Sequence, residues 1–176
     1  MLTVTMLSAA ALAGLVIYRR LWPGGLGAAP ILAAPPPVRA AAKRLDIVAQ
    51  PGTDPTDSLP CANICIAAMA VAFARMDDES FPCEGTIGTP LRRHLHTDAA
   101  QAHDIWTMPP WLVDEGGTPT QAFERLSKRL KRLDHGPYFG RMMGVLGDVT
   151  TAGTRGMPTA PQVDAMGALA RIFRTA

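Results

Sequence analysis

The first 18 residues constrain this chain most, because none of them carries a charged side chain. An α-helix rises about 1.5 Å per residue, so residues 1–18 would reach about 27 Å, close to the roughly 30 Å of a bilayer's hydrocarbon core. The run ends in residues that are typical of a membrane interface: Tyr18, Arg19, Arg20 and Trp22. The sequence therefore predicts one transmembrane anchor over residues 1–22.

The charges around this run also predict its orientation. No side-chain charge precedes the apolar residues, whereas Arg19 and Arg20 follow them directly. Because positively charged flanks stay on the cytoplasmic side, the rest of the chain should lie in the cytoplasm. Alanine and arginine are frequent and lysine is scarce, which suggests a GC-rich bacterial gene. We therefore expect a single-pass protein of the bacterial inner membrane that contacts lipids through residues 1–22.

Two other interpretations of residues 1–18 remain open. A cleaved secretory signal would need a basic region before the apolar run, and an amphipathic surface helix would need a polar stripe. The sequence has neither feature. Small side chains in the run would let another helix approach closely, so the anchor is also a candidate for docking against other membrane subunits.

Composition limits what the remaining residues can do. A net charge of +2 is too small to argue for a nucleic-acid partner. Three cysteines, an odd number, do not suggest a disulfide framework, which agrees with a reducing compartment.

Residues 23–57 are predicted to be a linker rich in proline and alanine. Its prolines interrupt helices, its alanines supply no large side chain for a core, and the Ala-Ala-Pro-Pro-Pro stretch should form a semi-rigid extended spacer. Within this linker we also consider a short helix over residues 38–48. One domain should then cover residues 58–176.

This domain is predicted to be all-α, with about six helices, because we find no convincing strand pattern. Residues 61–74 carry no charge, so this helix should be buried on every side at the centre of a bundle, and it is too short to span a membrane. Further helices are expected over residues 89–96 and 98–108, with Pro109-Pro110 stopping the second of them.

The last three helices have the clearest signals. Thr118-Pro119-Thr120-Gln121 and Thr159-Ala160-Pro161-Gln162 both have the composition of a capping box. The periodicity predicts one buried stripe per helix: Phe123, Leu126, Leu130 and Leu133, then Phe139, Met142, Leu146 and Val149, then Val163, Met166, Ala170 and Phe173.

This pattern resembles the TerB-like domain, the helical fold of tellurite-resistance TerB proteins and of the N-terminal region of DjlA-type membrane co-chaperones. That family repeats an apolar helix, a short acidic loop and a capped helix. Residues 67–79 look like the first copy, and residues 142–153 followed by Pro161-Gln162 look like the second. The resemblance covers about residues 60–176 and implies an all-helical domain behind a membrane anchor.

The chain departs from the family in ways that limit what the resemblance implies. The family's Asp-Gly becomes Asp77-Asp78 in the first loop and Ala152-Gly153 in the second, and Gln162 stands where Glu is usual. The His-Pro-Asp motif of a J domain is absent, so direct stimulation of an Hsp70 is not implied. Metal binding is not carried over from the family, although Asp77, Asp78 and Glu79 could hold a cation. These acidic residues could equally end a helix in water.

Other candidate chemistry is weaker. Cys61 and Cys65 lie one turn apart, with Cys83 after a loop, but zinc-knuckle spacing is absent and buried free cysteines are common on an apolar helix. A cluster of His94, His96 and His103 with Asp98 and Asp104 lacks the i, i+4 histidine pair of a helical metal site. We find no phosphate loop or nucleophile motif. The chain is therefore predicted to be no enzyme and to need no cofactor.

A basic stripe on the helix after Thr118 consists of Arg125, Lys128, Arg129 and Arg132. Such a stripe is ordinarily a solvated face, but beside a membrane it could meet an anionic leaflet or an acidic partner. The leading hypothesis is a non-enzymatic, membrane-anchored interaction module, an accessory or assembly subunit of a larger membrane complex. The alternative is a metal- or metalloid-responsive TerB-like stress protein.

Overall fold

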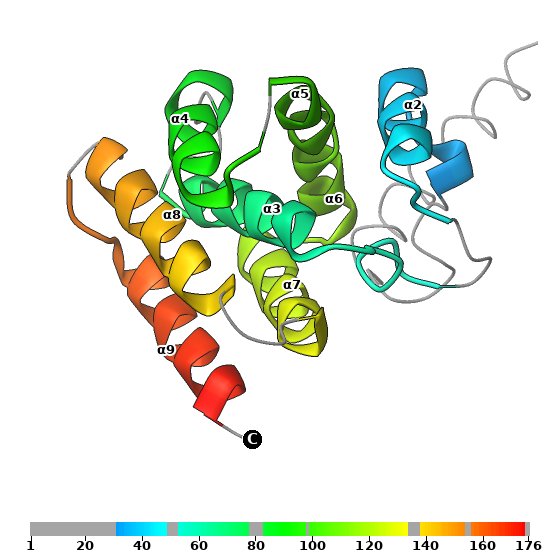
Figure 1. Cartoon of the computed structure of the whole chain (residues 1–176). Helices are drawn as coiled ribbons and strands as arrows, with labels where there is room; N and C mark the ends of the chain where they lie inside the picture. The colour runs from blue at the N-terminus through cyan, green and yellow to red at the C-terminus, as the bar shows by residue number, and fades with distance from the viewer. Residues whose placement is uncertain are drawn as a thin grey trace, which may run out of the picture.

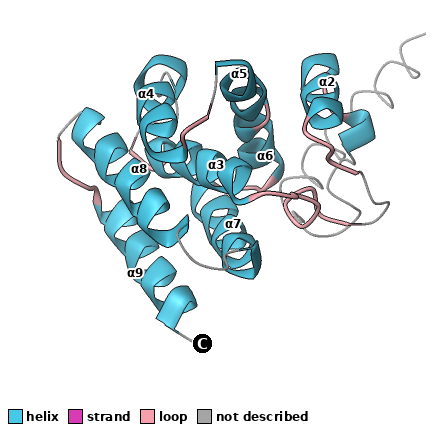
Figure 2. Ribbon diagram, in the orientation of Figure 1, coloured by secondary structure: helices cyan, strands magenta, loops and turns pink. Residues whose placement is uncertain are grey.

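The computed structural model describes residues 31–48, 53–77, 83–97, 99–133, 138–153 and 156–174. Every regular element in these ranges is a helix (Figure 2), which confirms the all-α prediction. None of the described helices is long and apolar enough to cross a membrane. The predicted anchor, with Tyr18, Arg19, Arg20 and Trp22, lies outside the described residues.

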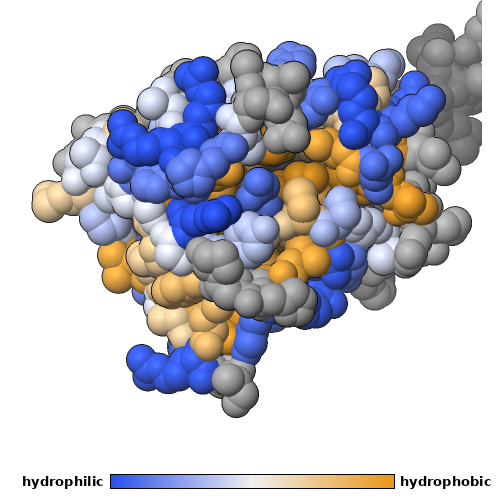
Figure 3. All heavy atoms as spheres, in the orientation of Figure 1, coloured by the Kyte–Doolittle hydropathy of each residue, from blue (hydrophilic) through white to orange (hydrophobic). Residues whose placement is uncertain are grey.

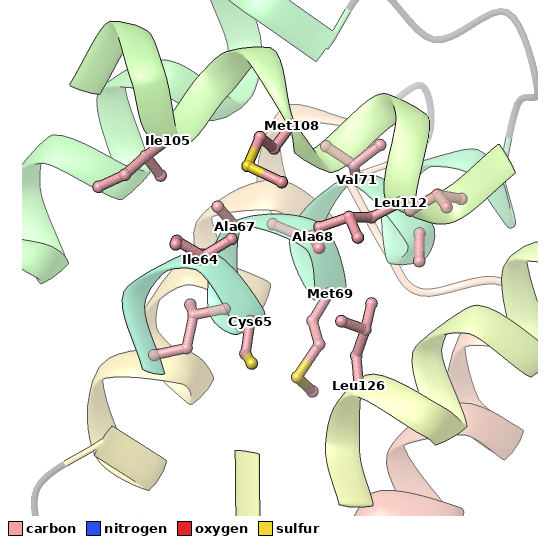
Figure 4. Close-up of a cluster of buried hydrophobic side chains, with 14 of the residues drawn as sticks. Ile64, Cys65, Ala67, Ala68, Met69, Val71, Ile105, Met108, Leu112 and Leu126 are labelled. Carbon is pink, nitrogen blue, oxygen red and sulfur yellow. The ribbon is translucent and has the colours of Figure 1, made fainter. Parts of the chain in front are cut away.

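Helix α3 (Ala62–Arg75) is the centre of the fold and packs against α4, α5, α6, α7 and α8 (Figure 1). Its residues from Ile64 to Ala74 are all buried, as the absence of charge predicted. Figure 4 shows how different neighbours contact different sides of α3: Met69 lies beside Leu126 of α7, whereas Ala68 lies on the side of Met108 and Leu112. Alanines between the larger residues allow these helices to approach closely.

Three short helices follow α3: α4 (Cys83–Leu95), α5 (Ala99–Thr107) and α6 (Pro109–Glu115). Helix α5 matches its predicted range to within one residue at each end. The prediction for α4 is wrong at its start, because the helix begins six residues before Thr89 and contains Pro90. Pro90 cannot donate the backbone hydrogen bond of an interior helix position, but α4 packs on α8 and its Ile87 is buried in the core.

Pro109 and Pro110 do more than stop α5. They occupy the first two positions of α6, where the backbone N–H groups have no intrahelical acceptor and proline is tolerated. The described part of residues 58–176 consequently has seven helices, α3 to α9, instead of about six.

The last three helices are α7 (Pro119–Leu133), α8 (Tyr138–Ala152) and α9 (Ala160–Arg174). The first capping box is complete: the Gln121 N–H donates to Thr118 Oγ1, and the Thr118 N–H donates to Gln121 Oε1, both at 3.3 Å. In the second box the Thr159 N–H donates to Gln162 Oε1 at 2.9 Å. The predicted stripe of α7 is buried except for half-buried Leu133.

The predicted buried stripe of α9 holds only in part, because Met166 and Phe173 are half-buried against the core and the other two residues are not buried. Val163 is 53% exposed and Ala170 is exposed, while the buried residues of α9 are Gln162, Ala165 and Leu169. The helix is therefore rotated by about one residue from the orientation that its apolar periodicity favours. On α8 the prediction holds for three of four residues, because Phe139 is 38% exposed.

The predicted linker also contains folded structure. Ile31–Ala33 forms a 3-10 helix, η1, and Pro36–Arg44 forms helix α2, whose Val38, Ala41 and Ala42 are buried. The short helix considered over residues 38–48 is confirmed in part, since α2 covers 38–44 but begins at Pro36 and packs against α5. The prediction of an extended spacer is wrong for Pro36 and Pro37, which lie in the first turn of α2.

An ion pair joins α2 to α5. The Arg44 guanidinium donates to both carboxylate oxygens of Asp104, with its Nε at 2.9 and 2.8 Å. This hydrogen-bonded guanidinium lowers the pKa of the Asp104 carboxyl below its ordinary value. The described part of residues 23–57 thus packs on the helical domain.

Candidate functional site

The basic stripe on α7 contacts the segment that precedes α3. Arg125 Nη1 donates to Asp54 Oδ2 at 3.2 Å, and Arg132 donates to Asp57 Oδ1. Between them Arg129 donates to the backbone carbonyl oxygen of Leu59, from Nε at 3.1 Å and from Nη2 at 2.5 Å. Three arginines, one helical turn apart, therefore hold two carboxylates and one peptide carbonyl.

The segment that these arginines hold is an acidic turn, residues 54–59. The Thr56 N–H donates to Asp54 Oδ1 at 2.8 Å, and the Asp57 N–H donates to the Asp54 carbonyl oxygen at 2.9 Å. Both carboxylates are thereby positioned toward α7. Leu59 at the end of the turn is fully buried, so the acidic turn combines two charges with one apolar anchor.

Lys128 is the exception in the stripe. Its Nζ lies 2.7 Å from Glu124 Oε1, one turn earlier on the same helix, and both side chains are exposed. Such a pair contributes little to stability. Sequence reasoning grouped Arg125, Lys128, Arg129 and Arg132 correctly on one face, and their use by an outside partner stays a prediction.

Asp54 and Asp57 were expected in the linker and Leu59 at the start of the domain, and none of the three was predicted as a site residue. Two acidic residues three positions apart, before a helix with no acid in its first turn, were the available signal. That signal does not say which basic residues would meet them, because more than 65 residues separate the partners.

The predicted acidic metal ligands are only partly described. Asp78 and Glu79 lie outside the described residues. Asp77 follows α3 and lies close to Gly153, since a Cβ built on Gly153 would be 3.3 Å from Asp77 Oδ2. The chain just after α3 therefore meets the residue that follows α8. Within the described ranges no three His, Cys, Asp or Glu side chains are grouped to hold a metal.

The structure separates the histidine cluster. His94 Nε2 lies 3.1 Å from Asp148 Oδ2 on α8, and Arg93 Nη1 donates to the same oxygen at 2.9 Å. The His94 ring reaches α8 across Gly144, where any Cβ would come within 2.6 Å of the ring. Asp104 instead pairs with Arg44, and Asp98 lies outside the described residues. His94 and Asp148 thus join α4 to α8.

The two described cysteine side chains differ in exposure. Cys65 is buried in α3, and this burial, together with nearby Cys61, raises the pKa of the Cys65 thiol to about 12. A thiol with that pKa is not a nucleophile at neutral pH. Cys61 is half-buried at the start of α3, and the side chain of Cys83 is outside what the structure describes.

Comparison of the chain with protein-family models, with curated proteins and with solved structures gives no match.

Proposed function

We propose that this chain is a non-enzymatic, membrane-anchored interaction module that serves as an accessory or assembly subunit of a larger inner-membrane complex. Residues 1–22 would hold it in the bilayer, with Tyr18, Arg19, Arg20 and Trp22 at the interface and the helical domain on the cytoplasmic side. The apolar run and the flanking charges support this placement. The domain would then present its binding surfaces to other membrane subunits.

An apolar surface on α8 and α9 is the observation that supports a role in protein interaction. The α9 stripe consists of Val163, Met166, Ala170 and Phe173; Val163 and Ala170 are exposed, and Met166 and Phe173 are half-buried. The exposed Phe139 of α8 extends it, since the Phe139 and Phe173 rings lie 5.0 Å apart. Figure 3 shows apolar side chains gathered over this side of the molecule.

An exposed apolar surface of this kind favours a protein partner. Single exposed apolar residues are normal, whereas neighbouring ones on two helices commonly mark an interaction site. The core does not need Val163 or Ala170, because α9 packs against the domain through Ala165 and Leu169. A partner that covers the α9 stripe would remove its apolar side chains from water.

Purification from native membranes in mild detergent tests this proposal. We expect the wild-type chain to migrate in a complex whose other chains are identified by mass spectrometry. Val163→Asn should reduce their recovery, whereas Asp164→Asn, an exposed neighbour on the same turn, should not. Migration of the wild-type chain as a lone monomer, with no co-purifying chain, would overturn the proposal.

The approach of Asp77 to Gly153 favours a second candidate, a metal- or metalloid-responsive TerB-like protein. Its ligands would be Asp77, Asp78 and Glu79. Metal analysis of the purified chain should then show a bound ion, and Ca²⁺ or Zn²⁺ should raise its melting temperature. Loss of that response in Asp77→Ala would support the candidate, and no ion with no response in the wild type would remove it.

A further inference from the structure

The basic face of α7 holds the chain's own acidic turn. Arg125 and Arg132 each contact a carboxylate, and Arg129 between them donates two N–H groups to a backbone carbonyl. A guanidinium fork suits planar oxygen acceptors, and a peptide carbonyl beside two carboxylates identifies the occupant as an acidic chain segment. A lipid headgroup offers no equivalent of the fully buried Leu59.

The attachment of the acidic turn depends on contacts of two kinds. The pairs Arg125–Asp54 and Arg132–Asp57 are partly exposed, with 30% of the Asp54 side chain and 44% of the Asp57 side chain accessible to solvent. Water screens such pairs, so they stabilise the turn only slightly. Leu59 supplies the apolar contact. A competing segment with the same three groups would have to replace the two ion pairs and also take the place of Leu59 in the core cluster that it shares with α3 and α7.

We propose that the α7 face is the docking site for an acidic segment of a partner protein, and that the chain's own acidic turn occupies it until that partner arrives. The partner segment would carry two carboxylates three positions apart and a large aliphatic residue two positions after the second. These are the spacings of Asp54, Asp57 and Leu59. The inference rests on the proposed function, because it names the chemistry of one partner of that interaction module.

The chain's own turn sets how tightly an outside segment must bind. A segment tethered by a short linker acts at an effective concentration of about millimolar. A free peptide with the same sequence should therefore bind the wild-type chain only weakly. Weakening the turn without touching α7 should make the face available.

The test uses the full chain in mild detergent and a fluorescein-labelled peptide with the sequence of residues 53–60. Fluorescence anisotropy should give at least a tenfold lower Kd for Asp54→Asn/Asp57→Asn than for the wild type. Asp46→Asn/Asp164→Asn removes the same charge from exposed positions outside the acidic turn and should bind like the wild type. Adding Arg132→Gln to the Asp54→Asn/Asp57→Asn variant should abolish its gain in affinity for the peptide.

Specificity is tested with a second peptide in which Ser replaces the leucine. It should bind the Asp54→Asn/Asp57→Asn variant much more weakly, because it lacks the apolar anchor. Equal binding of both peptides would mean a general attraction of charges and would overturn the proposal. Binding to anionic phosphatidylserine vesicles that depends on Arg125 and Arg132, with no peptide binding, would overturn it in favour of a lipid.

If the Asp54→Asn/Asp57→Asn variant does not fold, the same proposal can be tested on the wild type by hydrogen exchange. Amide hydrogen exchange in residues 54–59 should become faster as the peptide is added, because the turn is displaced, while α3 stays protected. Unchanged exchange at millimolar peptide would overturn the proposal. Peptide binding by a chain that purifies as a lone monomer would refute the proposed function alone, whereas a stable complex without peptide binding would refute only this inference.

Discussion

Helices α7 and α9 begin with nearly the same local chemistry, yet the fold uses them differently. Each has 15 residues, and each follows a threonine N-cap with proline in the first turn and glutamine at the third position. Helix α7 packs against α3, α6 and α9 and buries its predicted stripe. Helix α9 packs mainly on α7 and leaves much of its predicted stripe in solvent.

The two capping boxes show why the helices differ. In α7 both reciprocal hydrogen bonds form between Thr118 and Gln121. In α9 the Gln162 side chain is buried; its Oε1 caps the Thr159 N–H, and its Nε2 donates to the Phe73 carbonyl oxygen at 2.9 Å. Gln162 thus links the start of α9 to the end of α3. Gln162 lies on the buried side of α9, whereas Val163 next to it lies on the exposed side.

The largest expected contrast lies between the two stripes. Phe123→Ala should lower the free energy of unfolding by about 3–5 kcal/mol, because a buried ring that packs 5.9 Å from Phe73 is lost. Val163→Ala should change it by less than about 0.5 kcal/mol, as at most exposed positions. Urea unfolding followed by circular dichroism measures both. A large loss for Val163→Ala would mean that the α9 stripe is covered in solution.

The second-largest difference in unfolding free energy is expected between variants of the two capping glutamines, Gln162 and Gln121. Gln162→Glu should cost about 1–3 kcal/mol, because it removes the donor to the buried Phe73 carbonyl and places a carboxylate there. Gln121→Glu, the matched change at an exposed position of α7, should stay within about 0.5 kcal/mol, since glutamate also completes a capping box. Thermal unfolding of both variants at neutral pH measures this difference in stability. Equal effects would show that Gln162 acts only as a local cap.

The smallest contrast concerns the threonine caps. Thr118→Ala should cost about 1 kcal/mol, because Thr118 Oγ1 accepts the Gln121 N–H. Thr159→Ala should cost less, because Thr159 Oγ1 is buried and has no hydrogen-bond partner in the described part of the chain. Melting temperatures of the two variants test the order. A reversed order would mean that the α9 box forms both of its bonds in solution.

Local chemistry along the chain was enough to predict the all-α class, the buried α3 and the helix starts at Thr118 and Thr159. A helix without charge has no face for water, and a capping box depends on residues at most three positions apart. The same reasoning placed Arg125, Arg129 and Arg132 on one face of α7, because helical spacing is fixed.

Only the tertiary structure decided which residues of α9 are buried, that α2 packs against α5, and what the α7 arginines hold. Each outcome depends on groups far apart in sequence: Gln162 with Phe73, Arg44 with Asp104, and Arg132 with Asp57. Sequence periodicity shows that a helix has an apolar side or a basic side. Which neighbour covers that side depends on the tertiary fold. Residues that are adjacent in the sequence do not determine it.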